Sequence, residues 1–254
     1  GEYRFDRSMS LLDILHWLEQ GRVMLHKFTI PEGSTITQVA RLLSAKELAD
    51  SEEVLALASD PDLCEEFGVP GSTLEGYLFP ETYKIAKGLP AKQVLQILVD
   101  RFWHVWETEI GKRPENGAVQ LNDIISIASI IEKEAIYDDE KPLIASIIYN
   151  RLDKNMPLQC DVTIRYPLDN YGVHLTYADL RMNSPYNSYL YKGLPPTPIC
   201  NPGLAAIQAA LDPPQTEYFY FVSMNNGHHK FSATLREHNE AVFKYQILNH
   251  VGKK

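Results

Sequence analysis

Glu132 and Glu134 lie at the end of an apolar stretch, and their type and spacing point to acid chemistry. On a helix, the residues three and four positions before Glu134 are both isoleucine, whereas those before Glu132 are serine and alanine. A carboxyl group held against apolar surface has a raised pKa, and an acid that stays protonated near neutral pH can act as a general acid. We therefore predict Glu134 as the catalytic acid. The helical period alone does not exclude Glu132 as the acid. For both residues, the alternative to a catalytic role is an ordinary solvated surface glutamate.

A helix over residues 121–134 must position these carboxylates, because its isoleucines and alanines recur on one face. An acidic turn follows, and Pro142 opens a second predicted helix. Residues 156–166 then alternate between polar and apolar types and are rich in β-branched and aromatic residues, which predicts a half-exposed strand. The polar side chains that share one side of this strand are Gln159, Asp161, Thr163 and Arg165.

Two loops rich in aromatic residues are candidates for the walls of a binding cleft. Residues 71–83 contain two glycines and a proline, which prevents a long helix, and Glu75 offers a hydrogen-bonding group there. Residues 184–203 contain five prolines, which stiffen a loop that carries tyrosine and asparagine side chains. For both loops, a packed surface connection is the alternative to a carbohydrate-binding cleft.

The first part of the chain predicts a small βα module. Strands at residues 3–5 and 23–30 are each followed by a turn and an amphipathic helix. An irregular segment over residues 60–70 is the predicted hinge to a larger domain. We therefore predict an α+β fold, with the small module over residues 1–66 and a larger mixed α+β domain over residues 67–254.

Composition excludes several classes of function. A net charge of −9 argues against a nucleic-acid-binding surface. The three cysteines make no disulfide framework and have no metal-ligand spacing, so we predict buried free thiols, with a Cys160–Cys200 bond as the alternative in an oxidising compartment. We predict no metal and no cofactor. No apolar run approaches the ~20 residues that span a bilayer.

An ordered set of fragments gives a specific resemblance. In chain order these fragments are LEGYLFPETY, ASIIEKEA, NRL, LQCDVTIRY, YNSYLYKGLPPTPICNPG and EYFYFV. Together they resemble the MltG (YceG-like) family of endolytic murein transglycosylases over essentially all 254 residues. The second glutamate of that family's E-K-E motif is its catalytic one and corresponds to Glu134. The sequence departs from the family at Cys160, where a small hydroxylated residue is expected, and at Val162, where proline is common.

The resemblance implies a lytic transglycosylase reaction. The enzyme would cleave the β-1,4 bond between N-acetylmuramic acid and N-acetylglucosamine without adding water, and would leave a 1,6-anhydro end. Glu134 would act first as the general acid and then as the base. LysM-like units over residues 1–66 would bind or orient the glycan ahead of the catalytic domain. The substrate-binding residues that we predict are Glu75, Gln159, Asp161, Thr163, Tyr186, Asn187 and Tyr189.

The resemblance also implies partners and a location. Peptidoglycan glycan strands are the expected substrate, and cell-wall synthases are expected partners by analogy. The family carries an N-terminal membrane helix that these residues lack, and the sequence opens with GEYRF inside a predicted strand. We therefore expect a single-pass anchor in the bacterial inner (cytoplasmic) membrane to precede it, with the catalytic part on the periplasmic, extracytoplasmic side.

Two other functions stay open at this point. A hydrolytic muramidase with the same substrate needs a second carboxylate near Glu134, and Asp161 is the candidate. A non-catalytic peptidoglycan-binding scaffold needs only the LysM-like part. The mass of the cleaved ends separates the first alternative, because an anhydro end is one water lighter than a reducing end.

Overall fold

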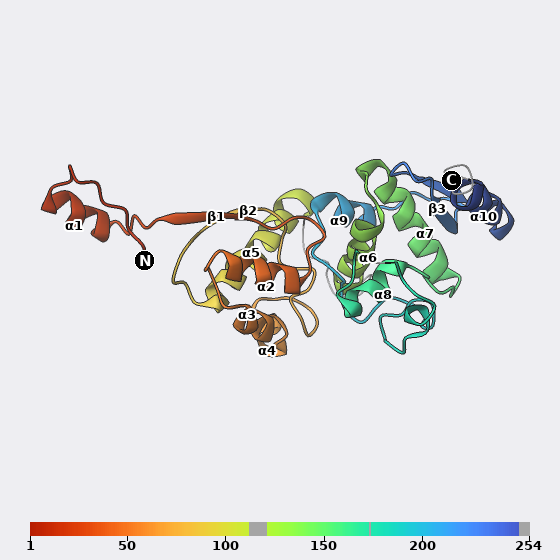
Figure 1. The fold of residues 1–254 in the computed structure, drawn as a ribbon, viewed down its shortest axis with the longest axis horizontal. Coiled ribbons are helices and arrows are strands. Elements are labelled where there is room, and N and C mark those ends of the chain that lie inside the picture. Colours follow the sequence, from red (N-terminus) through yellow and green to blue (C-terminus); the bar gives the residue numbers. More distant parts are fainter. Residues whose placement is uncertain (112–120, 173, 249–254) are drawn as a thin grey trace.

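Helices and two small antiparallel sheets make up the computed structural model, which describes residues 1–111, 121–172 and 174–248 (Figure 1). This mixture confirms the predicted α+β class. Turns of π-helix extend α5 and α10 at their C-terminal ends. In chain order, the elements are α1 (Leu11–Glu19), β1 (Leu25–Thr29), α2 (Ile36–Ala45), α3 (Ser51–Ala58), α4 (Pro61–Glu66), β2 (Thr82–Ala86), α5 (Ala91–Val105), α6 (Leu121–Glu134), α7 (Lys141–Asp153), α8 (Asp161–Leu168), α9 (Leu204–Leu211), β3 (Tyr220–Ser223), β4 (His229–Ser232) and α10 (Leu235–Val242).

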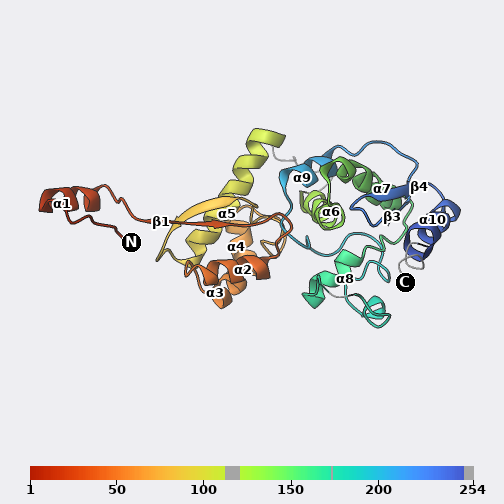
Figure 2. The ribbon, with the colours of Figure 1, turned by 45° about the horizontal axis from the view of Figure 1, so that its top comes forward.

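The first half of the molecule is built on the antiparallel pair of β1 and β2. The register runs from Leu25 opposite Ala86 to Thr29 opposite Thr82. Helix α3 packs against both α2 and α5, so that their apolar faces close one core beside the strands (Figure 1). Helix α1 lies beyond the far end of this strand pair and buries none of its residues (Figures 1 and 2). The β1–β2 pair joins residues on both sides of the predicted domain boundary at residue 66.

Local capping explains where the helices of this half begin. Thr35 and Gln38 form a reciprocal cap ahead of α2, and Asp60 caps α4, whose first residue is a proline. The predicted irregular hinge over residues 60–70 is therefore wrong at its start, because the cap and the proline begin a short helix there. The predicted strand at residues 3–5 is irregular instead, because none of the described strands pairs with it.

The second half of the molecule is organised around α6, and the sequence predicted a helix at this place. Every residue from Ile124 to Ile131 is buried, because α7, α8 and α9 all pack against α6 (Figure 2). The middle of the helix is therefore surrounded on all sides, rather than amphipathic with one buried face. At Glu134, the last residue of α6, the side chain becomes partly accessible.

A helix, α8, replaces the predicted strand over residues 156–166, so that prediction is wrong. The chain turns at Gln159, whose φ is 53°, and the amide of Cys160 donates to the Ser188 hydroxyl rather than to a neighbouring strand. The Thr163 hydroxyl donates back to the Cys160 carbonyl at 2.7 Å, which ties the first turn of the helix to the residue before it. Alternation over so short a stretch does not distinguish strand from helix when the deciding partners lie far along the chain.

A hairpin of β3 and β4 closes the C-terminal end, with α10 packed on it. The predicted strand over residues 217–224 is confirmed in its second half, where its side chains are half-buried rather than buried. The predicted final helix over residues 236–250 begins as α10, and its last two residues lie outside the described residues. None of the described helices is long and apolar enough to cross a membrane.

Gly76 is a position where the fold leaves no room for a side chain. Its φ is +94°, and a Cβ there would lie 2.6 Å from Ile125 and 2.8 Å from Pro198, whereas Gly88, with a φ of +82°, has open space around it. We therefore expect Gly76→Ala to lower the free energy of unfolding by about 2 kcal/mol more than Gly88→Ala, because only the first adds overpacking to backbone strain. Urea unfolding of both variants measures this difference, and equal losses would contradict close packing at Gly76.

Candidate active site

Glu134 lies at the C-terminal end of α6 and lines a cavity of about 420 Å³. The other walls come from α7, β3 and α10, from the turn that leads into α8, and from the proline-rich loop. A glutamate with the protein core behind it and a cavity in front is placed to exchange a proton with a bound molecule. The residues that line this cavity are Glu134, Arg151, Leu158, Gln159, Asp161, Tyr189, Tyr220, Phe221, Leu235 and His238.

The surroundings of Glu134 raise its pKa to about 7, mainly through burial and secondly through the negative charge of Asp161. A hydrogen bond with the Cys160 side chain and the positive charge of Arg165 act in the opposite direction. Burial and the neighbouring Glu134 raise the pKa of the Cys160 thiol well above its ordinary range, so this group stays neutral. Glu134 is therefore populated in both protonation states near neutral pH.

Glu132 has structural partners that Glu134 lacks. Its Oε2 lies 3.3 Å from Nζ of Lys141, and these two side chains are 8% and 3% exposed. The same oxygen accepts the backbone amide of Gly203 at 3.1 Å. The carboxylate of Glu132 therefore connects α6 to α7 and to the residue that precedes α9, which leaves Glu134 as the glutamate that faces the cavity.

Three of the predicted substrate-binding residues line the cavity with Glu134. Asp161 is exposed at the start of α8, and its Oδ1 accepts the Tyr189 hydroxyl at 2.7 Å. Gln159 is exposed in the turn before α8, and its amide donates to the carbonyl of Ser188 at 3.1 Å. The structure thus brings the turn before α8 and the proline-rich loop together beside Glu134.

Three other predicted substrate-binding residues lie outside the lining of this cavity and hold the loops behind it. Thr163 is fully buried, with its hydroxyl 2.8 Å from that of Ser188. Asn187 is also fully buried, and its side-chain amide donates to the carbonyls of Leu180 and Met182, just before the loop, at 3.1 and 2.9 Å. Tyr186 packs on Tyr166 with 5.0 Å between the ring centroids. Direct contact of these three residues with a substrate stays a prediction.

Glu75 lies in a separate buried cluster and does not line the Glu134 cavity. Its side chain accepts the Ile36 amide at 3.1 Å, the Tyr166 hydroxyl at 3.0 Å and the Asn201 side-chain amide at 3.2 Å. Burial raises its pKa to about 7. Because protein donors already occupy its oxygens and the residue is 1% exposed, its role in substrate binding also stays a prediction.

Sequence reasoning missed the part of the lining that comes from α7, β3 and α10. Arg151 donates from Nε to the carbonyl of Phe219 and from Nη1 to that of Leu158, both at 2.7 Å, and its guanidinium lies 5.3 Å from the centroid of the Tyr220 ring. Arg151 and Tyr220 both fall inside fragments that carried the family resemblance, so a usable signal was present. His238 gave no such signal, because it lies outside those fragments.

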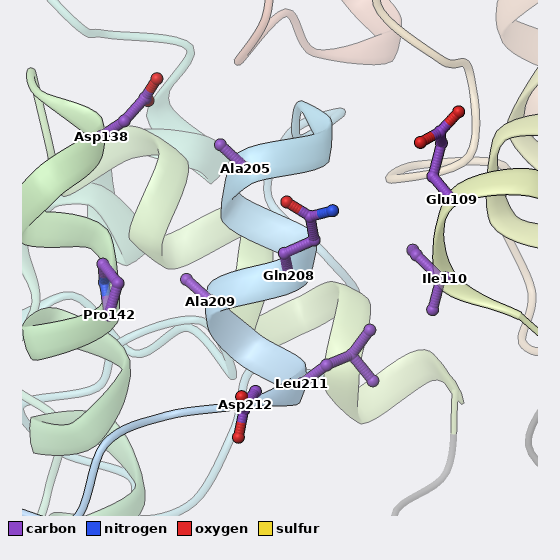
Figure 3. A pocket seen from close by; sticks show the side chains of 9 residues that line it. All are labelled: Glu109, Ile110, Asp138, Pro142, Ala205, Gln208, Ala209, Leu211 and Asp212. Atoms are coloured by element: carbon purple, nitrogen blue, oxygen red, sulfur yellow. The ribbon is translucent and has the colours of Figure 1, made fainter.

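A second cavity, of about 490 Å³, lies over α9, between the start of α7 and the π-helical turn after α5 (Figure 3). The charged side chains that line it are Glu109, Asp138 and Asp212. All three are exposed, so none is held against apolar surface in the way that Glu134 is. The chemistry of the lining, rather than the size of the cavity, therefore selects the Glu134 cavity as the candidate site.

The cysteine and histidine side chains support no metal centre in the described part of the chain. Within residues 1–111, 121–172 and 174–248, no group of three His, Cys, Asp or Glu side chains is placed to hold a metal ion. All three cysteines are buried and free, as the sequence predicted. The adjacent His228 and His229 instead approach the Glu140 carboxylate at 3.3 and 2.8 Å, which fastens the β3–β4 turn to the start of α7.

The fold and the site define an α+β protein whose central buried helix presents a glutamate of raised pKa to a cavity lined by aromatic and polar side chains. The chain belongs to the YceG-like family, whose profile matches residues 1–244. This match confirms the family resemblance that the ordered fragments indicated.

Known relatives and a solved structure agree with this membership. The chain is 33% identical over 261 residues to the endolytic murein transglycosylase of Bacillus subtilis strain 168, in an alignment that covers 96% of this chain and 72% of that protein. It is 30% identical to the endolytic murein transglycosylase of Streptococcus pneumoniae strain D39, covering all of this chain and 51% of that protein, about half its length. The crystal structure of a YceG-like protein from Listeria monocytogenes aligns with a TM-score of 0.73 and 32% identity, over 94% of this chain and 83% of that one.

The contrast between the two glutamates predicts opposite effects on stability. Glu132→Gln weakens the buried ion pair with Lys141, and we expect it to lower the free energy of unfolding by about 1–3 kcal/mol at pH 7. Glu134→Gln removes a carboxyl whose ionisation is opposed by burial, so at pH 8 it should not lower the free energy of unfolding as Glu132→Gln does. Because the folded-state pKa of Glu134 is about 7 and its ordinary value is 4.5, the wild type loses stability as pH rises from 4.5 to 7, and the variant lacks this loss.

Urea unfolding at pH 5 and pH 8 checks this contrast. Relative to the wild type, the free energy of unfolding of Glu134→Gln should be higher at pH 8 than at pH 5, by up to about 1.4 kcal/mol for each pH unit inside the window. Glu75 titrates in the same window but is present in both proteins, so it cancels in the comparison. A Glu134→Gln effect that is the same at both pH values would contradict the raised pKa.

Proposed function

We propose that this protein is a lytic transglycosylase that cuts peptidoglycan glycan strands at internal positions, with Glu134 as its general acid. The reaction class is supported by the YceG-like family and by curated relatives that are named endolytic murein transglycosylases. The observation that carries the choice of residue is the position of Glu134, at the end of a buried helix, facing a cavity, with a pKa raised to about 7.

In the proposed first step, protonated Glu134 donates its proton to the glycosidic oxygen of the bond between N-acetylmuramic acid and N-acetylglucosamine, and the bond from C1 to that oxygen breaks. The raised pKa matters here because it keeps a large fraction of the enzyme protonated at neutral pH. A glutamate of ordinary pKa would be protonated in fewer than about one molecule in a hundred at pH 7. The aglycone leaves with a free hydroxyl.

In the proposed second step, the Glu134 carboxylate takes the proton of the C6 hydroxyl of the muramyl sugar. The C6 oxygen then bonds to C1 and closes the 1,6-anhydro ring, so that no water is consumed and Glu134 is protonated again. The Cys160 hydrogen bond and the Arg165 charge lower the pKa and would stabilise the carboxylate between the two steps. One carboxyl serves both transfers, whereas retaining hydrolases use two carboxyls ~5–5.5 Å apart.

The lining of the cavity suits an N-acetylated sugar. Tyr189, Tyr220 and Phe221 supply aromatic surface, which packs well against the apolar face of a sugar ring. Gln159 and Asp161 supply exposed hydrogen-bonding groups on the same wall. Polar groups that fix orientation within an otherwise aromatic lining are what a site needs in order to hold one glycan register against Glu134.

The substrate also determines where the protein works. Because peptidoglycan lies outside the cytoplasmic membrane, we place the catalytic part on the extracytoplasmic side. The LysM-like role of residues 1–66, the catalytic role of residues 67–254 as a separate domain, the membrane anchor and the cell-wall synthase partners are further parts of the same proposal, and they rest on the family resemblance.

Glu134→Gln tests the assignment of the acid. The substitution keeps the size of the side chain but removes the proton that is transferred, so we expect the release of soluble fragments from purified peptidoglycan to fall by about 10²–10⁴-fold. The wild-type rate should fall tenfold per pH unit above about pH 7, where Glu134 ionises. Chromatography with mass spectrometry measures both the rate and the anhydro ends. Cleavage by a folded Glu134→Gln variant at the wild-type rate would contradict the assignment of Glu134 as the general acid.

Asp161→Asn separates the transglycosylase from a hydrolytic muramidase. Because the Asp161 charge raises the pKa of Glu134, removing it should lower that pKa and move the alkaline limb of the pH–rate profile to lower pH, while the products keep anhydro ends. A hydrolase that uses Asp161 as its second carboxylate should instead lose nearly all activity and should give reducing ends in the wild type. Asp153→Asn, at the exposed end of α7, removes the same charge elsewhere and serves as the control.

A further inference from the structure

His238 lies on α10 and lines the same cavity as Glu134, although it is remote from Glu134 in the sequence. Its ring stacks on Tyr220 of β3, with 5.3 Å between the centroids and 26° between the planes. Tyr220 also lies against the guanidinium of Arg151. That guanidinium donates to the backbone carbonyls of Phe219 and Leu158. The imidazole is therefore positioned by Tyr220, which packs on an arginine that is itself held by hydrogen bonds.

The two nitrogens of this ring are in different surroundings. Nδ1 is sealed from solvent and has no hydrogen-bond partner among the residues that the structure describes. Nε2 is not sealed in this way, so it is the ring nitrogen that a molecule in the cavity can reach. Buried polar atoms without a partner are rare in folded proteins because each costs stability. The unpaired Nδ1 is therefore a cost of holding the ring in this position, where Nε2 is left for the cavity.

The burial of Nδ1 also decides which form of the ring is present. Burial and the charge of Arg151 lower the pKa of His238, so the imidazole is neutral at pH 7. A neutral ring carries one N–H, and an orphaned buried N–H is less tolerated than an orphaned acceptor. The proton therefore resides on Nε2, where the ring presents a hydrogen-bond donor to the cavity.

We propose that His238 is a substrate-binding residue whose Nε2–H donates a hydrogen bond to an oxygen of an N-acetylated β-1,4-glycan in the Glu134 cavity. This inference rests on the proposed function, because it takes the glycan as the occupant of the cavity. The oxygen is a hydroxyl or an acetamido carbonyl, since both accept such a bond and neither requires a charged partner. His238 transfers no proton in this scheme and acts on binding.

Three substitutions separate a hydrogen-bonding role from mere packing on Tyr220. His238→Phe keeps a ring that can stack but has no donor. His238→Gln places an amide N–H near the position of Nε2, whereas His238→Asn places it near Nδ1. We expect the KM for peptide-free glycan strands to rise about fivefold to tenfold in the Phe and Asn variants, with little change in kcat, and to recover largely in the Gln variant. His238→Phe should also melt about 2–4 °C higher, because it removes the unpaired nitrogen.

Steady-state kinetics on the strands, together with thermal unfolding, measures these effects. A wild-type enzyme without activity contradicts the proposed function, whereas activity that His238→Phe leaves unchanged contradicts only the role of His238. A binding readout that needs no turnover is the ¹⁵N resonance of Nε2 in the Glu134→Gln variant, which the strands should shift. A resonance that stays in place overturns the inference whatever the kinetics show.

Discussion

The buried hydrogen-bond cluster around Glu75 and Asn201 is the constraint on which the rest of the structure depends. The Asn201 side chain accepts the amides of Gly76 and Leu78 and donates to the carbonyl of Ser34, while Glu75 accepts the amide that opens α2 and the hydroxyl of a tyrosine on α8. Segments from both halves of the chain therefore share one set of donors and acceptors, sealed from water, where each bond is costly to break. Because α8 is held at this cluster, its first residues are also fixed beside the Glu134 cavity.

Two of the glutamates in the described part of the chain, Glu75 and Glu134, have a pKa raised to about 7, and Glu75 does not line the cavity that Glu134 faces. Glu75 is surrounded by donors from the protein, so its raised pKa reflects the burial of a structural junction. Glu134 has one side open to a space that a ligand can occupy. A perturbed pKa is thus a sign of burial first and of function second, and the access of the carboxyl to a cavity separates the two cases.

Much of the fold was predictable from local pattern, because strong local signals and the final packing agree. The start of α2 follows from its cap, and the helix at α6 follows from its apolar periodicity. The helix at α8 was not predictable in this way, because the partner of Cys160 that prevents strand pairing is Ser188, far along the chain. In the candidate site, the isoleucine neighbours and the family motif predicted Glu134, which lines the cavity. Polarity alone did not distinguish Asp161, which reaches the cavity, from Thr163, which is buried in a hydrogen-bonded loop.

Helix α8 spans a fixed distance between the Glu134 cavity and the Glu75 cluster, and it contributes a different side chain to each. Asp161 at one end alters the ionisation of Glu134, and Tyr166 near the other end donates to Glu75. Adding or removing a single residue between them would turn one end by about 100° relative to the other and shift it by ~1.5 Å. A change of chain length within residues 161–166 would therefore displace one of these two contacts, whereas a change after the end of α8 leaves both in place. Variation in length among such proteins should follow this division even where the residues themselves differ.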